Sequence, residues 1–218
     1  DMVIDEPNEG DIKFERIFTN ESPDILSEQM LIVTKIKNGS GVKLVTQGYS
    51  GTGKSFILFG NEKNDGLVQS IIKNLNVDKV YVKIFEVYGY ALPYKFYYES
   101  DPELYIINHL FEESGEIKNP TIFRKKTEID DFMEEFSDYK KYTEIEKANI
   151  NILSTIVERA NDLRAKGYDI KGFDKKIKTV KKTTNNPQSS RSIFFVDLKI
   201  KIKNNNIPLV LVDMPGRE

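Results

Sequence analysis

The chain has 218 residues, of which 39% are hydrophobic and 30% are charged, and its formal net charge is −2. This length suits one domain with a substantial core, and the slightly acidic balance argues against a nucleic-acid binder, which is usually basic. The chain has no cysteine and one histidine, His109, which excludes disulfides, thiolate metal sites, a cysteine nucleophile and a multi-histidine metal site. The sequence shows no apolar run long enough to span a bilayer and no signal-peptide pattern at its start. We therefore expect an intracellular protein without a membrane partner, and we expect further residues before Asp1.

Strand and helix patterns alternate along the first 90 residues, which favours an α/β layered domain. Ile25, Ile32 and Ile36 recur at helical spacing after an N-cap at Ser22-Pro23, and Gly39 is the expected end of that helix. In chain order, the sequence predicts a strand over residues 12–18, this helix, a short buried strand over Val42–Thr46, a helix start over residues 55–59, a helix over residues 67–75 and a strand over residues 80–87.

The middle of the chain favours helix. Residues 127–130 resemble a capping box, and the residues expected on one face of the helix that follows are Ile129, Phe132, Met133 and Phe136. Thr143–Glu146 is a full capping box, so a second helix is predicted to begin there and to end at Gly167. Its apolar stripe would be Ile145, Ile152, Ile156, Ala160 and Leu163. His109 is expected on a surface or half-buried helix rather than in catalysis.

The last part of the chain predicts two strands, over residues 193–202 and 208–212, joined by a turn at residues 203–206. A lysine-rich stretch at residues 171–182 precedes them and is interpreted as a solvated connector, with binding of phosphate or of a tubulin tail as the alternative. The acidic residues at 128–138 are expected on the wet face of a helix rather than in an acid–base pair.

The strongest chemical signal is a segment that fits GxxxxGK[ST] and comprises Gly48, Tyr49, Ser50, Gly51, Thr52, Gly53, Lys54 and Ser55. A triphosphate needs backbone N–H groups around its β-phosphate, and glycines let the chain form that nest. The Lys54 ammonium would reach the β- and γ-phosphates, and the Ser55 hydroxyl would bind Mg²⁺. The segment lies between a predicted strand and a predicted helix, which is the context that gives the motif its meaning. We therefore predict a P-loop rather than a plain glycine-rich turn.

Two further segments raise the specificity of this interpretation. A serine-rich segment over residues 186–192 precedes one strand, and Asp213-Met-Pro-Gly216-Arg-Glu218 follows another. An acidic residue at the end of a hydrophobic strand suits the second magnesium contact of a P-loop enzyme. Either segment alone would be weak.

Taken in this order, the three segments resemble the kinesin motor family, with its P-loop, its first switch NxxSSRSH and its second switch DxxGxE. The segments Phe85-Glu-Val-Tyr88 and Phe14-Glu-Arg-Ile-Phe18 are similar to the family's FEIY and FDxVF segments. The resemblance implies that Ser189 and Ser190 close on the γ-phosphate, magnesium and the attacking water, and that Arg191 pairs with Glu218. It also implies that Asp213 holds magnesium through water, that Gly216 senses the γ-phosphate and that Phe56 lies against adenine. Asn186 matches the first residue of the first switch.

The chain also departs from the family pattern. Ile193 replaces the histidine after SSRS, and Pro215 and Arg217 replace the usual alanine and serine of the second switch. Proline removes an N–H and fixes φ, which stiffens that loop. The family's RxRP segment is absent, and the elements by which kinesins grip microtubules and transmit force follow the position of Glu218.

The expected fold is therefore a three-layer α/β P-loop NTPase of kinesin type, with a mixed central sheet, helices on both faces and the P-loop at the carboxyl end of a central strand. Residues 1–218 would form part of a kinesin-like domain, with a helical insertion at about 127–182. The expected function is binding and hydrolysis of ATP with Mg²⁺ in a cytoplasmic, cytoskeleton-associated protein that binds microtubules when complete. The alternatives are a nucleotide-binding scaffold with little or no motor activity, or a P-loop NTPase of another family.

Overall fold

The computed structural model describes residues 24–49, 51–61, 63–90, 103–116, 118–124, 126–134, 138–169, 176, 178–181 and 189–216. The predicted strand at residues 12–18 and the N-cap at Ser22-Pro23 lie outside these ranges. Among the helices of the described part, none is long and apolar enough to cross a membrane.

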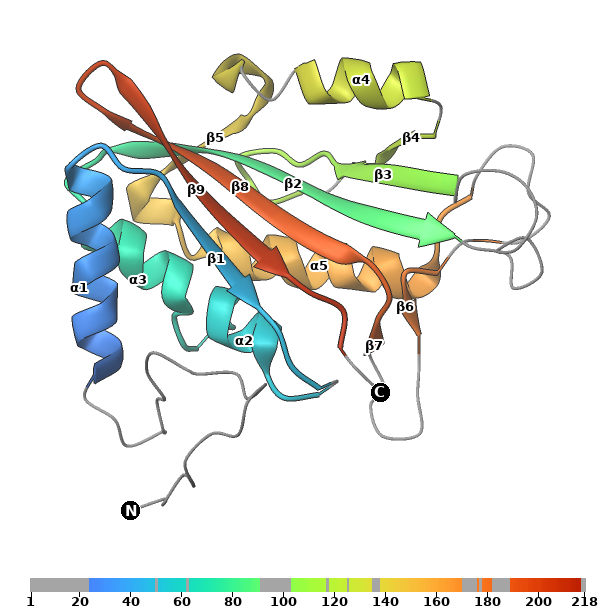
Figure 1. The fold of residues 1–218 in the computed structure, drawn as a ribbon, viewed down its shortest axis with the longest axis horizontal. Coiled ribbons are helices and arrows are strands. Elements are labelled where there is room, and N and C mark those ends of the chain that lie inside the picture. Colours follow the sequence, from blue (N-terminus) through green and yellow to red (C-terminus); the bar gives the residue numbers. More distant parts are fainter. Residues whose placement is uncertain are drawn as a thin grey trace, which may run out of the picture.

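Figure 1 shows the helices and strands of the described residues. The α-helices are α1 (Asp24–Lys37), α2 (Lys54–Phe59), α3 (Leu67–Lys73), α4 (Lys126–Glu134) and α5 (Ile152–Lys166). Short 3₁₀ turns cover Tyr139–Lys141 and Lys147–Asn149. The strands are β1 (Val42–Thr46), β2 (Lys79–Tyr90), β3 (Glu103–His109), β4 (Thr121–Phe123), β5 (Thr143–Glu146), β6 (Val180–Lys181), β7 (Ser189–Ser190), β8 (Ile193–Ile202) and β9 (Asn205–Asp213).

Within the described residues, the main sheet has seven strands in the order β1-β9-β8-β2-β3-β4, and β5 also pairs with β2. The β1–β9 pair is parallel and the other pairs of this sheet are antiparallel, so the sheet is mixed. Strands β8 and β9 form a hairpin in which Ile202 lies opposite Asn205. Its tight turn places Lys203 at a φ of 54°. A separate two-stranded ribbon joins β6 to β7.

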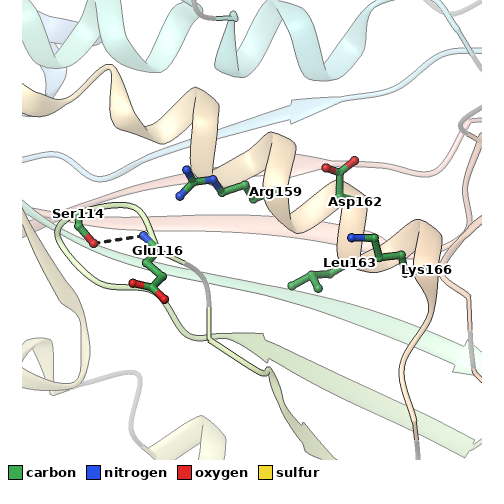
Figure 2. A pocket seen from close by; sticks show the side chains of 6 residues that line it. All are labelled: Ser114, Glu116, Arg159, Asp162, Leu163 and Lys166. Carbon is green, nitrogen blue, oxygen red and sulfur yellow. Dashed lines mark hydrogen bonds between the residues drawn. The ribbon is translucent and has the colours of Figure 1, made fainter.

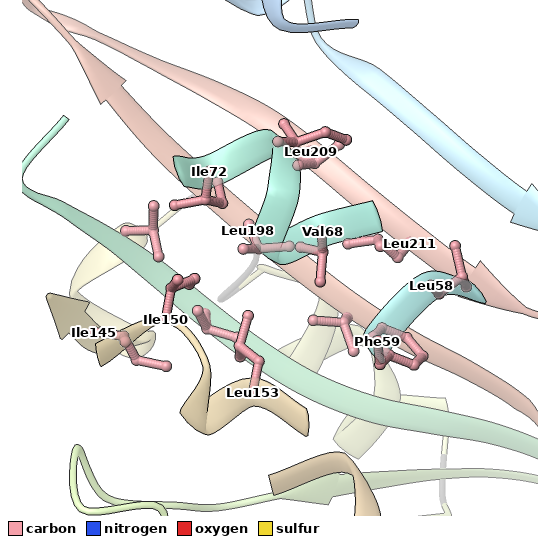
Figure 3. Packing of buried hydrophobic residues seen from close by; sticks show 14 of the residues in the cluster. Leu58, Phe59, Val68, Ile72, Ile145, Ile150, Leu153, Leu198, Leu209 and Leu211 are labelled. Atoms are coloured by element: carbon pink, nitrogen blue, oxygen red, sulfur yellow. The ribbon is translucent and has the colours of Figure 1, made fainter. Parts of the chain in front are cut away.

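Helices cover both faces of the main sheet (Figure 1). The larger core lies on one face, where residues of α1, α2, α3 and α5 pack against the even-numbered positions of β2 and β8, such as Val82 and Val196. Figure 3 shows part of this packing, including Leu58, Phe59 and Leu153. On the other face a smaller cluster joins Phe132 of α4 to Phe85 and Ile106. Side chains alternate between the two faces of a strand, so the same strands supply both clusters and the three-layer α/β prediction is confirmed.

Most predicted elements of the described part are present. The predicted strand at Val42–Thr46 is β1 with the same bounds, and the predicted helices after residues 55 and 67 are α2 and α3. Gly39 and Gly167 follow α1 and α5 with φ values of 86° each, a conformation that glycine adopts without steric cost. These two glycines therefore end their helices as expected.

The prediction of a helix start at Thr143–Glu146 is wrong. This segment is β5, and its pairing with β2 places Val80 opposite Ile145 and Lys79 opposite Glu144. The Lys79 ammonium donates to Glu144 Oε2 at 2.8 Å. Helix α5 begins only at Ile152, because pairing with a neighbouring strand satisfies the backbone groups that the helix would have used. The segment at 127–182 is accordingly not purely helical, since it supplies β5 to the main sheet.

Two other predictions need correction. His109 is the last residue of β3 and is 1% exposed, so it lies on a buried strand rather than on a surface helix. Strand β1 stands at the end of the strand order in the described part, beside β9. Its Val45 side chain is 60% exposed, so the P-loop follows a half-exposed edge strand rather than a buried central one.

Candidate nucleotide site

The P-loop connects the end of β1 to the start of α2, which is the predicted strand–loop–helix arrangement. Gly51 and Gly53 have φ values of 81° and 82°. An added Cβ at Gly53 would meet no atom within 4 Å, so the backbone conformation, rather than space, requires glycine there. The glycine spacing in the sequence thus coincides with positive φ values at Gly51 and Gly53, which glycine adopts without steric cost.

The Lys54 ammonium lies across this loop. It donates hydrogen bonds to the carbonyl oxygens of Gly48 at 3.2 Å and Tyr49 at 2.8 Å. The Thr52 hydroxyl also donates to the Tyr49 carbonyl, at 2.9 Å. The cation is therefore held at the loop itself, and an incoming phosphate would compete with two neutral carbonyl oxygens for it.

The parallel pairing of β1 with β9 brings Asp213 to the P-loop. The register places Thr46 opposite Asp213, the last residues of the two strands. Asp213 Oδ1 accepts a hydrogen bond from the Thr46 hydroxyl at 3.0 Å, and Oδ2 accepts one from the Ser55 hydroxyl. Asp213 is 5% exposed, so its carboxylate is buried. The hydrogen bonds from the two hydroxyl groups fix its orientation at the end of the P-loop. Ser55 and Asp213, which the sequence separates by 158 residues, are thus in direct contact.

Thr46 is a member of this site that the sequence interpretation missed. The only available signal was a hydroxyl residue at the end of the strand before the P-loop. Its role depends on the strand register, because a shift of one residue would turn its side chain to the other face.

The donor set at Ser55 and Asp213 fits Mg²⁺. Magnesium is a hard cation that prefers oxygen ligands and is commonly bound by one or two carboxylates together with substrate phosphates and water. Within the described ranges no cluster of three His, Cys, Asp or Glu side chains is present. One carboxylate and one hydroxyl in direct contact are a donor set of the kind that magnesium accepts.

The backbone of the first switch is described only at its carboxyl end. Ser189 and Ser190 form β7, which pairs with β6, and the Arg191 N–H donates to the Thr179 carbonyl at 2.7 Å. The side chains of Ser189 and Ser190, and the whole of Ser50, Asn186 and Glu218, lie outside the described residues. The Arg191–Glu218 pair and the contact of Ser190 with magnesium therefore stay predictions.

Two aromatic residues beside the P-loop are exposed. Phe56 on α2 is 50% exposed and Tyr49 in the loop is 70% exposed. Exposed aromatic faces next to a phosphate site suit stacking on a purine base. Gly216 follows β9 at partial burial, three residues beyond Asp213.

A hollow of about 570 Å³ lies along α5 and is lined by Ser114, Glu116, Arg159, Asp162, Leu163 and Lys166 (Figure 2). The Arg159 guanidinium donates to the Gly115 carbonyl at 2.5 Å, which ties α5 to the loop after β3. Two acidic and two basic side chains line this hollow, so their formal charges cancel.

No protein-family model matches the chain. A curated relative, the uncharacterized protein L294 of Acanthamoeba polyphaga mimivirus, is 27% identical over 274 residues. That alignment covers 97% of this chain and 9% of the relative, so the chain spans less than a tenth of the length of this relative.

Among solved structures, the chain is similar to a KIF14 fragment with ADP in complex with a microtubule, with a TM-score of 0.45 and 14% identity. This match covers 92% of our chain and 55% of that one. A KIF14 dimer in a two-heads-bound state, with AMP-PNP and a microtubule, gives a TM-score of 0.40 and 11% identity over 86% of this chain and 49% of that chain. The chain spans about half the length of these solved chains.

Proposed function

We propose that this chain binds ATP with magnesium at the P-loop and hydrolyses it as part of a kinesin-like domain. The observation that carries the proposal is the contact between Ser55 at the end of the P-loop and Asp213 at the end of β9. A glycine-rich turn that matched the motif by chance would not be expected to end beside a buried carboxylate whose orientation two hydroxyl groups fix. The assignment to kinesins, rather than to another P-loop family, rests on the motif order in the sequence.

The residues of the site suggest how each step would proceed. The loop N–H groups would surround the β-phosphate, and Lys54 would exchange the carbonyl oxygens of Gly48 and Tyr49 for phosphate oxygens. Ser55 and Asp213 would hold magnesium, which when bound would supply positive charge beside the phosphate oxygens. Ser189 and Ser190 would hold a water in line with the γ-phosphorus. As the water oxygen forms a bond to that phosphorus, the bond to the β–γ bridging oxygen would break, so that ADP leaves with the bridging oxygen and the proton of the water passes to an oxygen of the released phosphate. The protein's contribution is mainly positioning, because phosphoryl transfer needs little covalent help.

A nucleotide-binding scaffold with little turnover is the second candidate. Pro215 stands between Asp213 and Gly216 in the second switch, where it removes one N–H and restricts the backbone. A stiffer second switch would bind nucleotide yet close slowly on the γ-phosphate. The two candidates separate on single-turnover kinetics, since a scaffold keeps tight ATP binding and shows no phosphate release above the uncatalysed rate.

Association with microtubules belongs to this proposal for the complete protein and implies a cytoplasmic, cytoskeleton-associated location. The motif resemblance supports it. Co-sedimentation of the complete protein with microtubules, with and without a non-hydrolysable ATP analogue, tests it directly. If the protein stays in the supernatant under both conditions, the microtubule part of the proposal is refuted and only the proposal of a nucleotide site is kept.

Binding itself is tested by thermal unfolding. A ligand that binds only the folded state raises stability by RT ln(1 + [L]/Kd), which is about 2.7 kcal/mol at a hundredfold excess over Kd. We expect magnesium-ATP to raise the melting temperature, and we expect Lys54→Ala to abolish the rise. Lys43→Ala is the matched control, because Lys43 is an exposed lysine of β1 outside the P-loop. An unchanged melting temperature at millimolar ATP would count against the P-loop assignment.

A further inference from the structure

Five buried polar side chains form a cluster behind the first switch, which we call the Glu86 cluster. Glu86 lies on β2, His109 on β3 and Arg164 on α5. Tyr168 follows α5, and Ser192 directly precedes β8. Each of them is at most 4% exposed. Burying an ionic or polar group costs free energy unless the group is hydrogen-bonded or paired, so the hydrogen bonds among these side chains are what make their burial possible.

The Glu86 carboxylate is the centre of the cluster. Its Oε2 accepts hydrogen bonds from Arg164 Nε at 3.0 Å and from the Ser192 hydroxyl. Its Oε1 accepts one from the Tyr168 hydroxyl at 2.5 Å. Arg164 also reaches Ser192 directly, because its Nη2 lies 2.9 Å from the Ser192 hydroxyl oxygen. Glu86, Arg164 and Ser192 therefore form a closed triangle of hydrogen bonds.

The charge state of Glu86 fits a structural anchor rather than a proton acceptor. Burial raises the pKa of this carboxyl, but the hydrogen bond from His109, the charge of Arg164 and the hydrogen bond from Ser192 outweigh burial and bring the pKa to about 2. The carboxyl is therefore ionised throughout the neutral range. A group with so low a pKa is a poor general base near neutral pH.

Ser192 connects this cluster to the first switch. It follows Arg191, whose N–H donates to the Thr179 carbonyl, and Arg191 follows the β7 residues that pair with β6. In that pairing Val180 lies opposite Ser190 and Lys181 lies opposite Ser189. The carboxyl end of the switch is thus held at consecutive residues, and the Ser192 side chain enters the buried cluster.

We infer that Ser192 is a positioning residue: its hydroxyl, held by Glu86 and Arg164, fixes the carboxyl end of the first switch so that Ser189 and Ser190 approach the γ-phosphate from a rigid base. The effect on hydrolysis rests on the proposed function. The anchoring of the backbone does not, because it is a property of the protein without nucleotide.

Hydrogen exchange on the complete, nucleotide-free protein tests the anchoring. Ser192→Ala and the matched control Tyr168→Phe each remove one hydrogen bond to the same carboxylate, but only Ser192 belongs to the switch. Local opening sets exchange rates, so we expect the amides of residues 189–191 to exchange at least about tenfold faster in Ser192→Ala. In Tyr168→Phe we expect them to stay within about twofold of wild type. Equal exchange in wild type and Ser192→Ala, or equal acceleration by both variants, would overturn the inference.

Two further variants guard against general unfolding. Ser192→Thr keeps the hydroxyl and should restore protection of residues 189–191. Arg164→Lys keeps a cation beside Glu86 but lacks the planar fork that reaches both partners, so it should lose protection at residues 189–191 while retaining a cooperative thermal transition. Full protection in Arg164→Lys would contradict the role of the triangle.

Turnover gives the readout that a merely structural residue would not change. Loss of an outer partner that orients a reacting group commonly costs about 10–100-fold in activity. We expect Ser192→Ala to lower kcat by that factor while the Kd for ATP stays within about twofold, and we expect Tyr168→Phe to change neither. A normal kcat in Ser192→Ala would refute the positioning role. A wild type that neither binds nor hydrolyses ATP would refute the proposed function, and the exchange measurement would still decide the anchoring.

Discussion

Removing the guanidinium from the Glu86 cluster should be among the most destabilising single changes in the described core. In Arg164→Met the Glu86 carboxylate, which is 0% exposed, would lose its charged Nε partner at 3.0 Å. Breaking a buried ion pair by removing one member typically costs about 3–5 kcal/mol. Because about 1 kcal/mol shifts the melting temperature of a domain of this size by roughly 2–4 °C, we expect a fall of roughly 6–20 °C.

The lowered pKa of Glu86 gives the stability that ionisation of this carboxyl contributes to the folded chain. The pKa of Glu86 is lowered from 4.5 to about 2 in the folded chain. At about 1.4 kcal/mol per tenfold change, this corresponds to about 3 kcal/mol of stability at neutral pH. Because the folded pKa is the lower one, this stability is present above pH 4.5 and is lost as the pH falls toward 2.

Urea denaturation at a series of pH values measures both effects. We expect the stability difference between wild type and Glu86→Gln to shrink as the pH falls below 4.5. Protonation of Glu86 in wild type removes the same negative charge that the substitution removes. We also expect the double variant Glu86→Leu/Arg164→Met to lose less than the sum of Glu86→Leu and Arg164→Met, because paired groups are not additive. A difference that is independent of pH, together with additive single variants, would refute the assignment of Glu86 and Arg164 as a buried ion pair.

Three further predictions concern the nucleotide site and the loop beside it. Phe56 should stack on any purine face, so competition assays should show only a modest preference for ATP over GTP. A hundredfold preference for GTP would favour another P-loop class. In the complete protein, Glu218→Ala should leave ATP binding nearly intact and reduce turnover by about 10²–10³; unchanged phosphate release would count against its pairing with Arg191. Gly60→Ala should destabilise the chain by at least about 1–3 kcal/mol, because Gly60 has a φ of 63° and an added Cβ would lie 2.1 Å from the Asn64 carbonyl oxygen. Gly89→Ala, which would meet no atom within 4 Å, is the control in the same denaturation assay, and equal losses would contradict the steric argument.

Local sequence determined the parts of this protein that depend on backbone conformation and periodicity. The ends of α1 and α5 follow from Gly39 and Gly167, whose positive φ values suit glycine. The P-loop follows from Gly51 and Gly53 for the same reason. These features need only neighbouring residues, so a motif read along the chain was enough to place them. The hairpin strands β8 and β9 were also placed from the sequence, because each contains a run rich in apolar residues.

Tertiary structure decided what the local pattern could not. Thr143–Glu146 carries a full helix-capping signal, yet pairing with β2 makes it a strand, because cross-strand hydrogen bonds and burial of Ile145 outweigh a weak local preference. His109 is buried because it ends a strand that pairs with the middle of β2. Asp213 reaches Ser55, and Ser192 reaches Glu86, only through sheet register and the packing of α5. Such contacts join residues more than a hundred positions apart, and no local periodicity encodes them.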